Sequence, residues 1–403
     1  MSATSRANGS PIRGIRKTQA VLLALVVLAF NLRAPILAVP PVLETIQRDL
    51  GLSGVAAGLI TTLPVLCFGL VSPLAPVLAR RLGLDTTLML AMTAIATGVI
   101  VRMGQPALAL YLGTLGLGTG IALLNVLIPA FVKREAPNRV GTMTSLYTML
   151  LNAGAGVGSA LTVPVMAATG WGWRPALGIW AIPAAIGIAV MVPWVLHQRR
   201  GAAGLRTLTR RRGLWNSPLA WQVTIAMGTQ SMIFFSVAAW LPTLLQDAGM
   251  GEARSGAMLS VMTLSGLGGS FITPILANRT RSQSWLSPVT TTLLAGPLVA
   301  LIVAPLWGTV LWVAMLGFGL GMIIALMLTL IILRAPDAQR ASDLGGMAQG
   351  VGYLFASMGP IILGAIHDRT DGWTLPLIFC VALLVPYSIN AWLAGRPRLV
   401  SAH

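Results

Sequence analysis

The sequence predicts an all-α polytopic membrane protein, with twelve transmembrane helices in two parallel six-helix repeats around a central cavity. Of the 403 residues, 56% are hydrophobic and only 9% are charged, whereas a soluble domain carries about 25% charged residues. Apolar runs recur along the whole chain, and each is long enough to cross a bilayer as a helix. The two halves also resemble each other, which indicates a duplicated bundle.

We expect the spans to be joined by short connections. The basic N-terminal tail leads directly into a first run that is too long for the apolar region of a signal peptide. In chain order, the expected spans are 18–43, 53–79, 85–102, 106–131, 140–168, 175–196, 217–246, 254–278, 285–306, 308–333, 341–366 and 374–395.

The positive charges predict the sidedness of these spans. If the N-terminus is cytoplasmic, 21 of the 27 Lys and Arg residues lie on cytoplasmic tails and loops and five lie on outside loops. This bias follows the positive-inside rule and places both termini in the cytoplasm. The Arg-rich segment from His197 to Gly213 then serves as a topology anchor and linker at the anionic leaflet, so the net charge of +17 does not indicate nucleic-acid binding.

A repeat at an offset of about 200 residues divides the chain. Five short matches occur in the same order, and they pair segments that begin at Asp49 and Asp247, Pro76 and Pro274, Gly116 and Gly317, Val140 and Leu344, and Gly172 and Gly372. Six spans in each half give the copies the same orientation, which favours alternating access around a shared site. We expect an N-terminal bundle at 1–196, a basic linker at 197–216 and a C-terminal bundle at 217–403.

Four segments carry a resemblance to a known family: "NLRAPILAVPPVL", "NVLIPAFVKREAP", "GTQSMIFFSVAAWLPTLLQDAG" and "MAQGVGYLFASMGP". Together they resemble the cyanate and 2-nitroimidazole transporter family of the major facilitator superfamily. The resemblance implies a secondary transporter in the cytoplasmic membrane of a bacterium. One departure lies between spans 2 and 3, where Arg80 stands in place of the superfamily's usual Asp. We expect Arg80 and Arg81 to take part in a gating contact that is made differently here.

Acidic residues and histidines give no intramembrane proton relay. All ten Asp and Glu residues lie in loops or at span ends, and His197, His367 and His403 lie at span ends or at the C-terminus. Coupling to protons would then require a span-end group such as Glu44, or protonation of the substrate itself. The two cysteines, Cys67 and Cys380, lie in apolar runs and predict neither a disulfide nor a metal site.

Arg33 is the one charged residue expected well inside a span. It lies 16 residues after Lys17, which is about 24 Å of helix. Burying such a cation costs roughly 3 kcal/mol on insertion scales. In a structural role, its partners would be water, amides or backbone carbonyls freed near Pro35 and Pro40. In a functional role, it would face the cavity and bind an anionic or strongly electronegative substrate, which is the interpretation we favour.

Amides and aromatic residues on spans 4, 5, 7 and 11 are further candidates. Amides both bind substrates and hold transmembrane helices together, but Gln230 and Gln349 lie in the family-like segments, which favours binding for those two. We expect Trp240, near a span end, to act as an interfacial anchor or a gate. The remaining candidates for substrate binding or for the cavity wall are Asn125, Asn152, Tyr147, Phe234, Phe235 and Tyr353.

Three classes of function are considered for this sequence. The leading hypothesis is a secondary transporter of a small anion or small polar molecule, with Arg33 as the substrate-binding charge. The alternative is an exporter of uncharged drugs or metabolites in which Arg33 is structural. A receptor or an intramembrane enzyme is disfavoured, because no sensor domain and no catalytic or metal constellation is visible. Glycine-rich runs lie inside apolar spans without a preceding strand, so we expect no nucleotide, no other cofactor and no ATP drive within this chain. We expect a monomer in the lipid bilayer.

Overall fold

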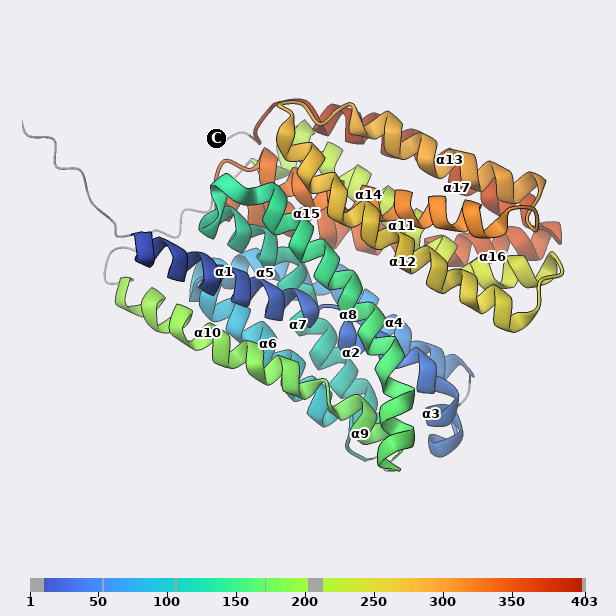
Figure 1. Ribbon diagram of the computed structural model, residues 1–403, viewed down its shortest axis with the longest axis horizontal. Coiled ribbons are helices and arrows are strands. Elements are labelled where there is room, and N and C mark those ends of the chain that lie inside the picture. The colour runs from blue at the N-terminus through green and yellow to red at the C-terminus, as the bar shows by residue number, and fades with distance from the viewer. Residues whose placement is uncertain (1–10, 53, 106, 171, 202–212, 401–403) are drawn as a thin grey trace, which may run out of the picture.

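The computed structural model describes residues 11–52, 54–105, 107–170, 172–201 and 213–400, and these residues form helices and no strands (Figure 1). In the first half the helices are α1 (Pro11–Phe30), α2 (Ala34–Leu37), α3 (Leu43–Leu50), α4 (Gly54–Val71), α5 (Leu74–Leu82), α6 (Leu84–Val101), α7 (Ala107–Glu135), α8 (Val140–Thr169), α9 (Trp173–Gly178) and α10 (Ala181–Gly201). In the second half they are α11 (Pro218–Asp247), α12 (Glu252–Arg279), α13 (Leu286–Val303), α14 (Thr309–Arg334), α15 (Ala338–Ala356), α16 (Gly359–Thr370) and α17 (Thr374–Ala394). Short 3-10 turns lie at Pro40–Val42 (η1), Pro137–Arg139 (η2) and Leu214–Asn216 (η3).

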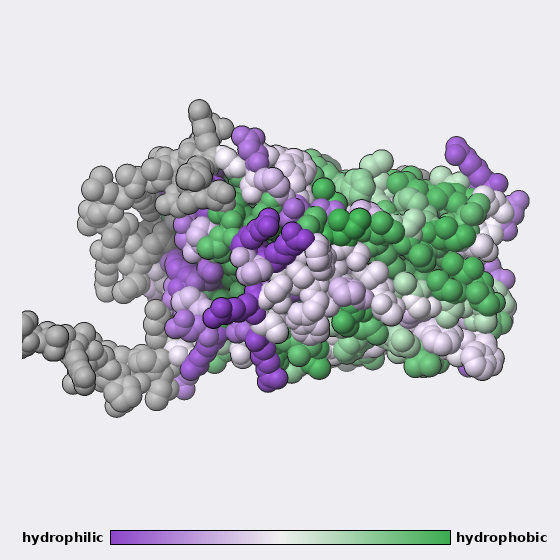
Figure 2. Space-filling model, turned by 90° about the horizontal axis from the view of Figure 1, so that it is seen from above, coloured by the Kyte–Doolittle hydropathy of each residue, from purple (hydrophilic) through white to green (hydrophobic). Residues whose placement is uncertain are grey.

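The predicted twelve-span plan is confirmed. Over the described residues, eleven helical segments are long and apolar enough to cross a membrane, and α4 with α5 adds a bent twelfth. Figure 1 shows the long helices running side by side, with α1 beginning and α17 ending at the same end. Hydrophilic side chains gather toward that end of the face seen in Figure 2, and hydrophobic ones cover much of the remaining length.

The first span is broken in its middle, close to Pro35 and Pro40, where the sequence predicted an interruption of the helix ladder. Helix α1 stops at Phe30, three residues form a turn, and the chain resumes as α2 and η1. The side-chain amide of Asn31 supports the break, donating to the carbonyls of Val27 at 2.8 Å and Pro183 at 3.1 Å. Pro35 and Pro40 have no backbone N–H, so the hydrogen-bond ladder of one helix cannot continue through this stretch.

Two other spans are also broken near prolines. Helices α4 and α5 meet at an angle of 62° at Ser72 and Pro73. Helix α15 ends at Ala356, and α16 begins at Gly359 with Pro360 in its first turn. The break between α4 and α5 lets that span change direction, whereas α15 and α16 together still form one span, Ala338–Thr370.

The two halves are joined near the end where α1 begins and α17 ends, which we call the basic end. There Arg80 Nη1 lies 2.5 Å from Asp343 Oδ1 and joins α5 to α15. Ser145 Oγ donates to the carbonyl of Phe271 at 2.7 Å and joins α8 to α12. These contacts hold the halves together between the basic end and the centre of the bundle.

The sequence repeat also recurs in the contacts at the other end of the bundle, which we call the opposite end. In the first half, Trp173 Nε1 donates to Asp49 Oδ2 at 3.0 Å. In the second half, Trp373 Nε1 donates to Asp247 Oδ2 at 2.8 Å. Helix α10 continues to Gly201, five residues past the predicted end of its span at 196. Residues 202–212 of the predicted linker lie outside the described residues.

Candidate functional site

A cavity of about 330 Å³ lies between the two halves. Six spans contribute to its wall, three from each half, as the predicted central cavity requires. From the first half it is lined by Arg33, Ile36, Leu37, Pro40, Thr61, Pro64, Val65, Phe68, Asn152 and Ala155. From the second half it is lined by Phe234, Phe235, Ala238, Leu259, Met262, Thr263, Gly266, Ser270, Gly317, Leu320, Gly321 and Ile324.

Arg33 lies at the break in the first span, and its side chain is half-buried. Among the described residues, it is the one charged side chain that lines the cavity. Its guanidinium makes no hydrogen bond and no ion pair with any other described residue. The break therefore places a cation on the wall of the cavity between the two halves.

Arg102 donates a hydrogen bond to the backbone carbonyl of Pro35. This is one of the freed carbonyls that Arg33 would have bound in a structural role. Val39 N donates to the carbonyl of Ile36, which leaves the carbonyl of Pro35 outside the helix ladder. Arg102, at the end of α6 and fully buried, donates to that carbonyl at 2.7 Å and to the carbonyl of Leu177 at 2.9 Å. The buried cation that holds the broken backbone is therefore Arg102, which the sequence had placed on an outside loop.

Close backbone packing also fixes the break. A Cβ atom on Gly154 would lie 2.5 Å from the carbonyl oxygen of Phe30, and one on Gly158 would lie 2.5 Å from that of Ala34. Both glycines are on α8, which packs against α1 and α2. The glycine run in this span thus serves close helix contact.

Asn152 brings an amide to the cavity wall. Its Nδ2 donates to the carbonyl of Thr148 at 2.9 Å and to Ser270 Oγ at 3.2 Å, so it bridges α8 and α12. Ser270 in turn donates to the carbonyl of Gly321 at 3.2 Å. This chain of hydrogen bonds gives the cavity one polar side shared by both halves.

Aromatic rings form much of the rest of the wall. Phe234 and Phe235 line the cavity from α11, and Phe68 lines it from α4. Tyr353 lies behind them, with its ring centroid 5.6 Å from that of Phe68 and 6.3 Å from that of Phe235. Tyr147 is fully buried, and its hydroxyl has no hydrogen-bond partner within the described ranges.

Three other predicted residues lie away from this wall. Gln349 Nε2 donates to the backbone carbonyl of Asn125 at 3.0 Å, so these two residues belong to the contact between α15 and α7. Gln230 is buried within α11 and donates to Ser231 Oγ at 2.6 Å. None of the three side chains is among those that line the cavity in the described part of the chain.

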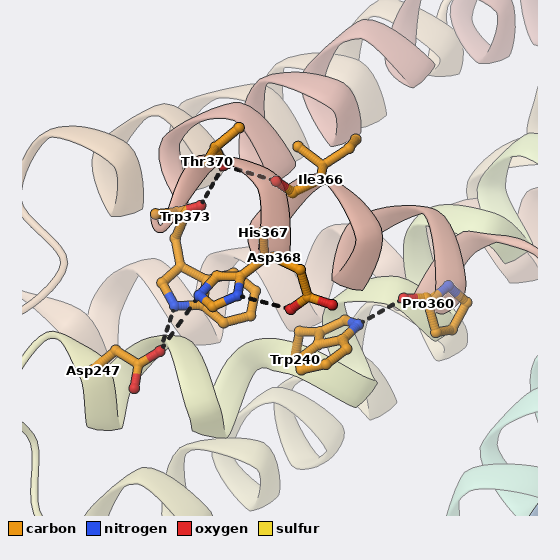
Figure 3. A network of polar contacts seen from close by, with 9 residues as sticks. Trp240, Asp247, Pro360, Ile366, His367, Asp368, Thr370 and Trp373 are labelled. Atoms are coloured by element: carbon orange, nitrogen blue, oxygen red, sulfur yellow. Dashed lines mark hydrogen bonds and ion pairs between the residues drawn. The ribbon is translucent and has the colours of Figure 1, made fainter.

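The predicted gating residues lie at two different ends. Arg80 pairs with Asp343 across the halves at the basic end, and its neighbour Arg81 is exposed. Trp240 packs inside its own half, where Nε1 donates to the carbonyl of Pro360 at 2.9 Å and the indole contacts Trp373 (Figure 3). Their roles in gating stay predictions.

The sequence did not indicate several residues of the wall. Thr61, Thr263 and Ser270 are short hydroxyl residues, which also occur throughout transmembrane helices for packing and local hydrogen bonding. Phe68 lies in a uniformly apolar run. Only the pairing of α4, α8 and α12 around one space identifies these residues, and sequence periodicity does not reveal which span faces which.

The arrangement suits the binding of a small molecule. A cavity of this size falls within the roughly 300–1,000 Å³ range of small-molecule sites, in which apolar walls and a few polar groups set orientation. Arg33 supplies directed N–H donors and Asn152 supplies an amide. Among the described residues, no cluster of three or more His, Cys, Asp or Glu side chains could hold a metal ion.

Three curated relatives match nearly the whole chain. The uncharacterized transporter YycB of Bacillus subtilis is 37% identical, and the match covers 94% of this chain and 94% of the relative. The 2-nitroimidazole transporter of Escherichia coli is 35% identical over 95% of this chain and 97% of its own length. The cyanate transport protein CynX of Escherichia coli is 27% identical over 94% and 99%.

Solved structures agree with the fold. The proton:xylose symporter XylE superposes with a TM-score of 0.74 at 15% identity, and the match covers 96% of this chain and 98% of that one. Residues 21–360 match the Major Facilitator Superfamily. With its duplicated twelve-span fold and its full-length similarity to bacterial transporters, the chain belongs to the Major Facilitator Superfamily.

Proposed function

We propose that this transporter moves a small anion, or a small polar molecule with a strongly electronegative group, across the cytoplasmic membrane by alternating access. Arg33 is the observation that carries the proposal. Among the described residues this cation has no hydrogen-bond or ion-pair partner, and it lines a cavity shared by both halves. A negatively charged or electronegative ligand that accepts its hydrogen bonds would stabilise it. The Tyr147 hydroxyl is also buried and unpaired among the described residues, but Tyr147 is not one of the residues that line the cavity.

The shape of the cavity supports a ligand with a flat apolar body. Its walls carry Phe68, Phe234 and Phe235, and its volume of about 330 Å³ is far larger than a three-atom anion requires. A small ring can stack on these aromatic side chains while its electronegative group meets Arg33. The names of the two Escherichia coli relatives, a 2-nitroimidazole transporter and a cyanate transport protein, are consistent with this class of substrate.

The contacts between the halves support an outward-facing arrangement. The basic end is held by Arg80 with Asp343 and by Ser145 with the carbonyl of Phe271. The distribution of Lys and Arg assigns the basic end to the cytoplasm. With that side closed, substrate reaches Arg33 from the opposite end.

An exporter of uncharged drugs or metabolites is the alternative, and the mostly apolar wall favours it. In that case the Arg33 charge would be solvated by water in the cavity and would not contact the cargo. The two functions differ in one measurable property, the dependence of transport on the charge of the ligand.

Exchange in proteoliposomes tests the proposal. Vesicles loaded with benzoate are diluted into labelled benzoate. A parallel set of vesicles uses benzamide, the neutral counterpart of benzoate with the same shape. Cyanate and 2-nitroimidazole are tested in the same way. We expect exchange of benzoate or of the two electronegative probes, and a loss of at least tenfold in Arg33→Ala, since one charge-assisted hydrogen bond contributes about 1.5–3 kcal/mol. Arg48→Ala, at an exposed arginine of α3, is the matched control. Equal exchange of benzoate and benzamide that Arg33→Ala leaves unchanged would support the exporter instead.

A further inference from the structure

An aspartate, a tryptophan and a cation meet at the opposite end of the first half. Trp173 Nε1 donates to Asp49 Oδ2 at 3.0 Å, and Arg174 Nη1 lies 3.1 Å from the same oxygen. The guanidinium also lies over the Trp173 ring, 4.4 Å from its centroid. Since arginine is always protonated in proteins, this group carries a fixed positive charge.

The second half has the same group with a different cation. Trp373 Nε1 donates to Asp247 Oδ2 at 2.8 Å, and the His367 imidazole stacks on the Trp373 ring at 4.2 Å between centroids (Figure 3). His367 Nε2 lies 3.8 Å from the same Asp247 oxygen. Histidine ordinarily changes its charge between pH 5 and 8, so the cation of this half is one that protons can add or remove.

In the second half, this group joins three different helical elements. Asp247 ends α11, Trp373 precedes α17, and His367 lies in α16, the segment beyond the break in span 11. Helix α15, before the break, is held to the first half through Asp343 and Gln349. Helix α16 packs on α11 and α17 of its own half. His367 therefore links the outer segment of a broken span to α11.

Carboxylates dominate the surroundings of His367. Asp247 faces it from α11, and Asp368 Oδ1 lies 3.6 Å from His367 Nδ1 on its own helix. Asp371 lines the same pocket, while Arg369 is exposed on α16. Helix α17 carries no Asp, Glu, Lys, Arg or His. At 3.6–3.8 Å a neutral imidazole makes no hydrogen bond to these carboxylates, whereas an imidazolium is attracted to both.

We propose that His367 is a proton-binding switch that fastens α16 to α11 and thereby holds the opposite end open. A proton on His367 adds an attraction to Asp247 and Asp368, so the fastening is stronger in acidic solution and weaker in alkaline solution. Its side chain is 27% exposed, which gives protons direct access from the solvent on that side. The switch goes beyond the proposed function, because it needs no substrate.

Fluorescence tests the proton site itself, because an imidazolium quenches an indole stacked on it. We expect the emission of the purified protein without substrate to step down as pH falls from 8 to 5, and His367→Gln to remove that step. His197→Gln, at a histidine of α10, is the matched control and keeps it. A step that survives in His367→Gln, or a wild-type emission that does not change with pH, overturns the assignment.

Pulsed EPR tests the conformational role. Spin labels are placed at Thr169 on α8 and Ala365 on α16, both exposed, after replacement of the buried Cys67 and Cys380 by Ala. We expect the open fraction to rise up to about fivefold from pH 8 to pH 5.5, the range of an exposed ion pair. His367→Gln should abolish the change, and His367→Arg should give the acidic distance distribution at both pH values. A pH response retained in His367→Gln, or a His367→Arg variant that still responds, contradicts the switch.

Discussion

The ion pair between Arg80 and Asp343 is the contact whose loss we expect to shift the two halves most clearly. Arg80 Nη1 lies 2.5 Å from Asp343 Oδ1, and the same carboxylate accepts from Gln339 Nε2 at 3.1 Å. The pair joins α5 to α15 at the basic end, so it has to break when that end opens. Its contribution therefore falls on one state of the transport cycle only.

The magnitude follows from burial. The two side chains are 27% and 14% exposed, which lies between an exposed pair at about 0–1 kcal/mol and a buried one whose disruption costs about 3–5 kcal/mol. We take about 1–2 kcal/mol for removal of one partner, which corresponds to about a five- to thirtyfold shift in the ratio of the two states. Arg80→Gln and Asp343→Asn should each produce a shift of this size toward the state with an open basic end.

Pulsed EPR between labels at Asn138 and Arg281 reads this ratio, because both residues are exposed and lie on different halves near the basic end. Arg398→Gln, at an exposed arginine just beyond the end of α17, is the matched control. The double variant of Arg80 and Asp343 should shift the ratio no further than either single one, and exchanging the two charges should restore the wild-type distribution. If Arg80→Gln behaves like Arg398→Gln, or if the two single effects add, the pair does not hold the basic end closed.

Two further predictions concern the break in the first span. Arg102→Met leaves the carbonyls of Pro35 and Leu177 buried without donors. We therefore expect a loss of about 2–4 kcal/mol in stability, measured as a lower thermal midpoint in detergent. A midpoint equal to that of the wild type would show that another donor replaces Arg102. Gly158→Ala forces a methyl group against the carbonyl of Ala34 and should cost about 1–3 kcal/mol by the same measurement. Gly156→Ala, with no neighbour within 4 Å of the new atom, should cost nothing, and equal midpoints for the two glycine variants would contradict the packing described here.

Hydropathy and the internal repeat were sufficient to predict the fold. Runs of about 20 apolar residues fix the spans because lipid leaves no alternative to a helix for an isolated apolar segment. The repeat fixes the relation between the halves, and its pairing of Asp49 with Asp247 recurs in the tryptophan contacts of both. The breaks were less visible, since a proline inside a membrane helix produces a kink, a break or nothing according to what satisfies the freed carbonyls.

The candidate site was predicted only in part. Arg33 could be identified because a cation in an apolar run is costly wherever it points, and Asn152 and Phe234 lie on the cavity wall with it. Gln230 and Gln349 could not be separated from packing amides, because an amide donates equally well to a ligand or to a neighbouring helix. The roles of Arg33 and Arg102 depend on which carbonyl each one reaches, and that is a property of the tertiary structure.

Thermal stability in detergent, measured with benzoate and with benzamide, tests the role of Arg33 most directly. A ligand at about 100 times its Kd stabilises the folded protein by about 2.7 kcal/mol. We expect benzoate, but not benzamide, to stabilise the wild type and Arg48→Gln, and Arg33→Gln to lose the response. Stabilisation by both compounds to the same degree, unchanged in Arg33→Gln, would contradict a substrate-binding role for this arginine and would favour an exporter of uncharged compounds.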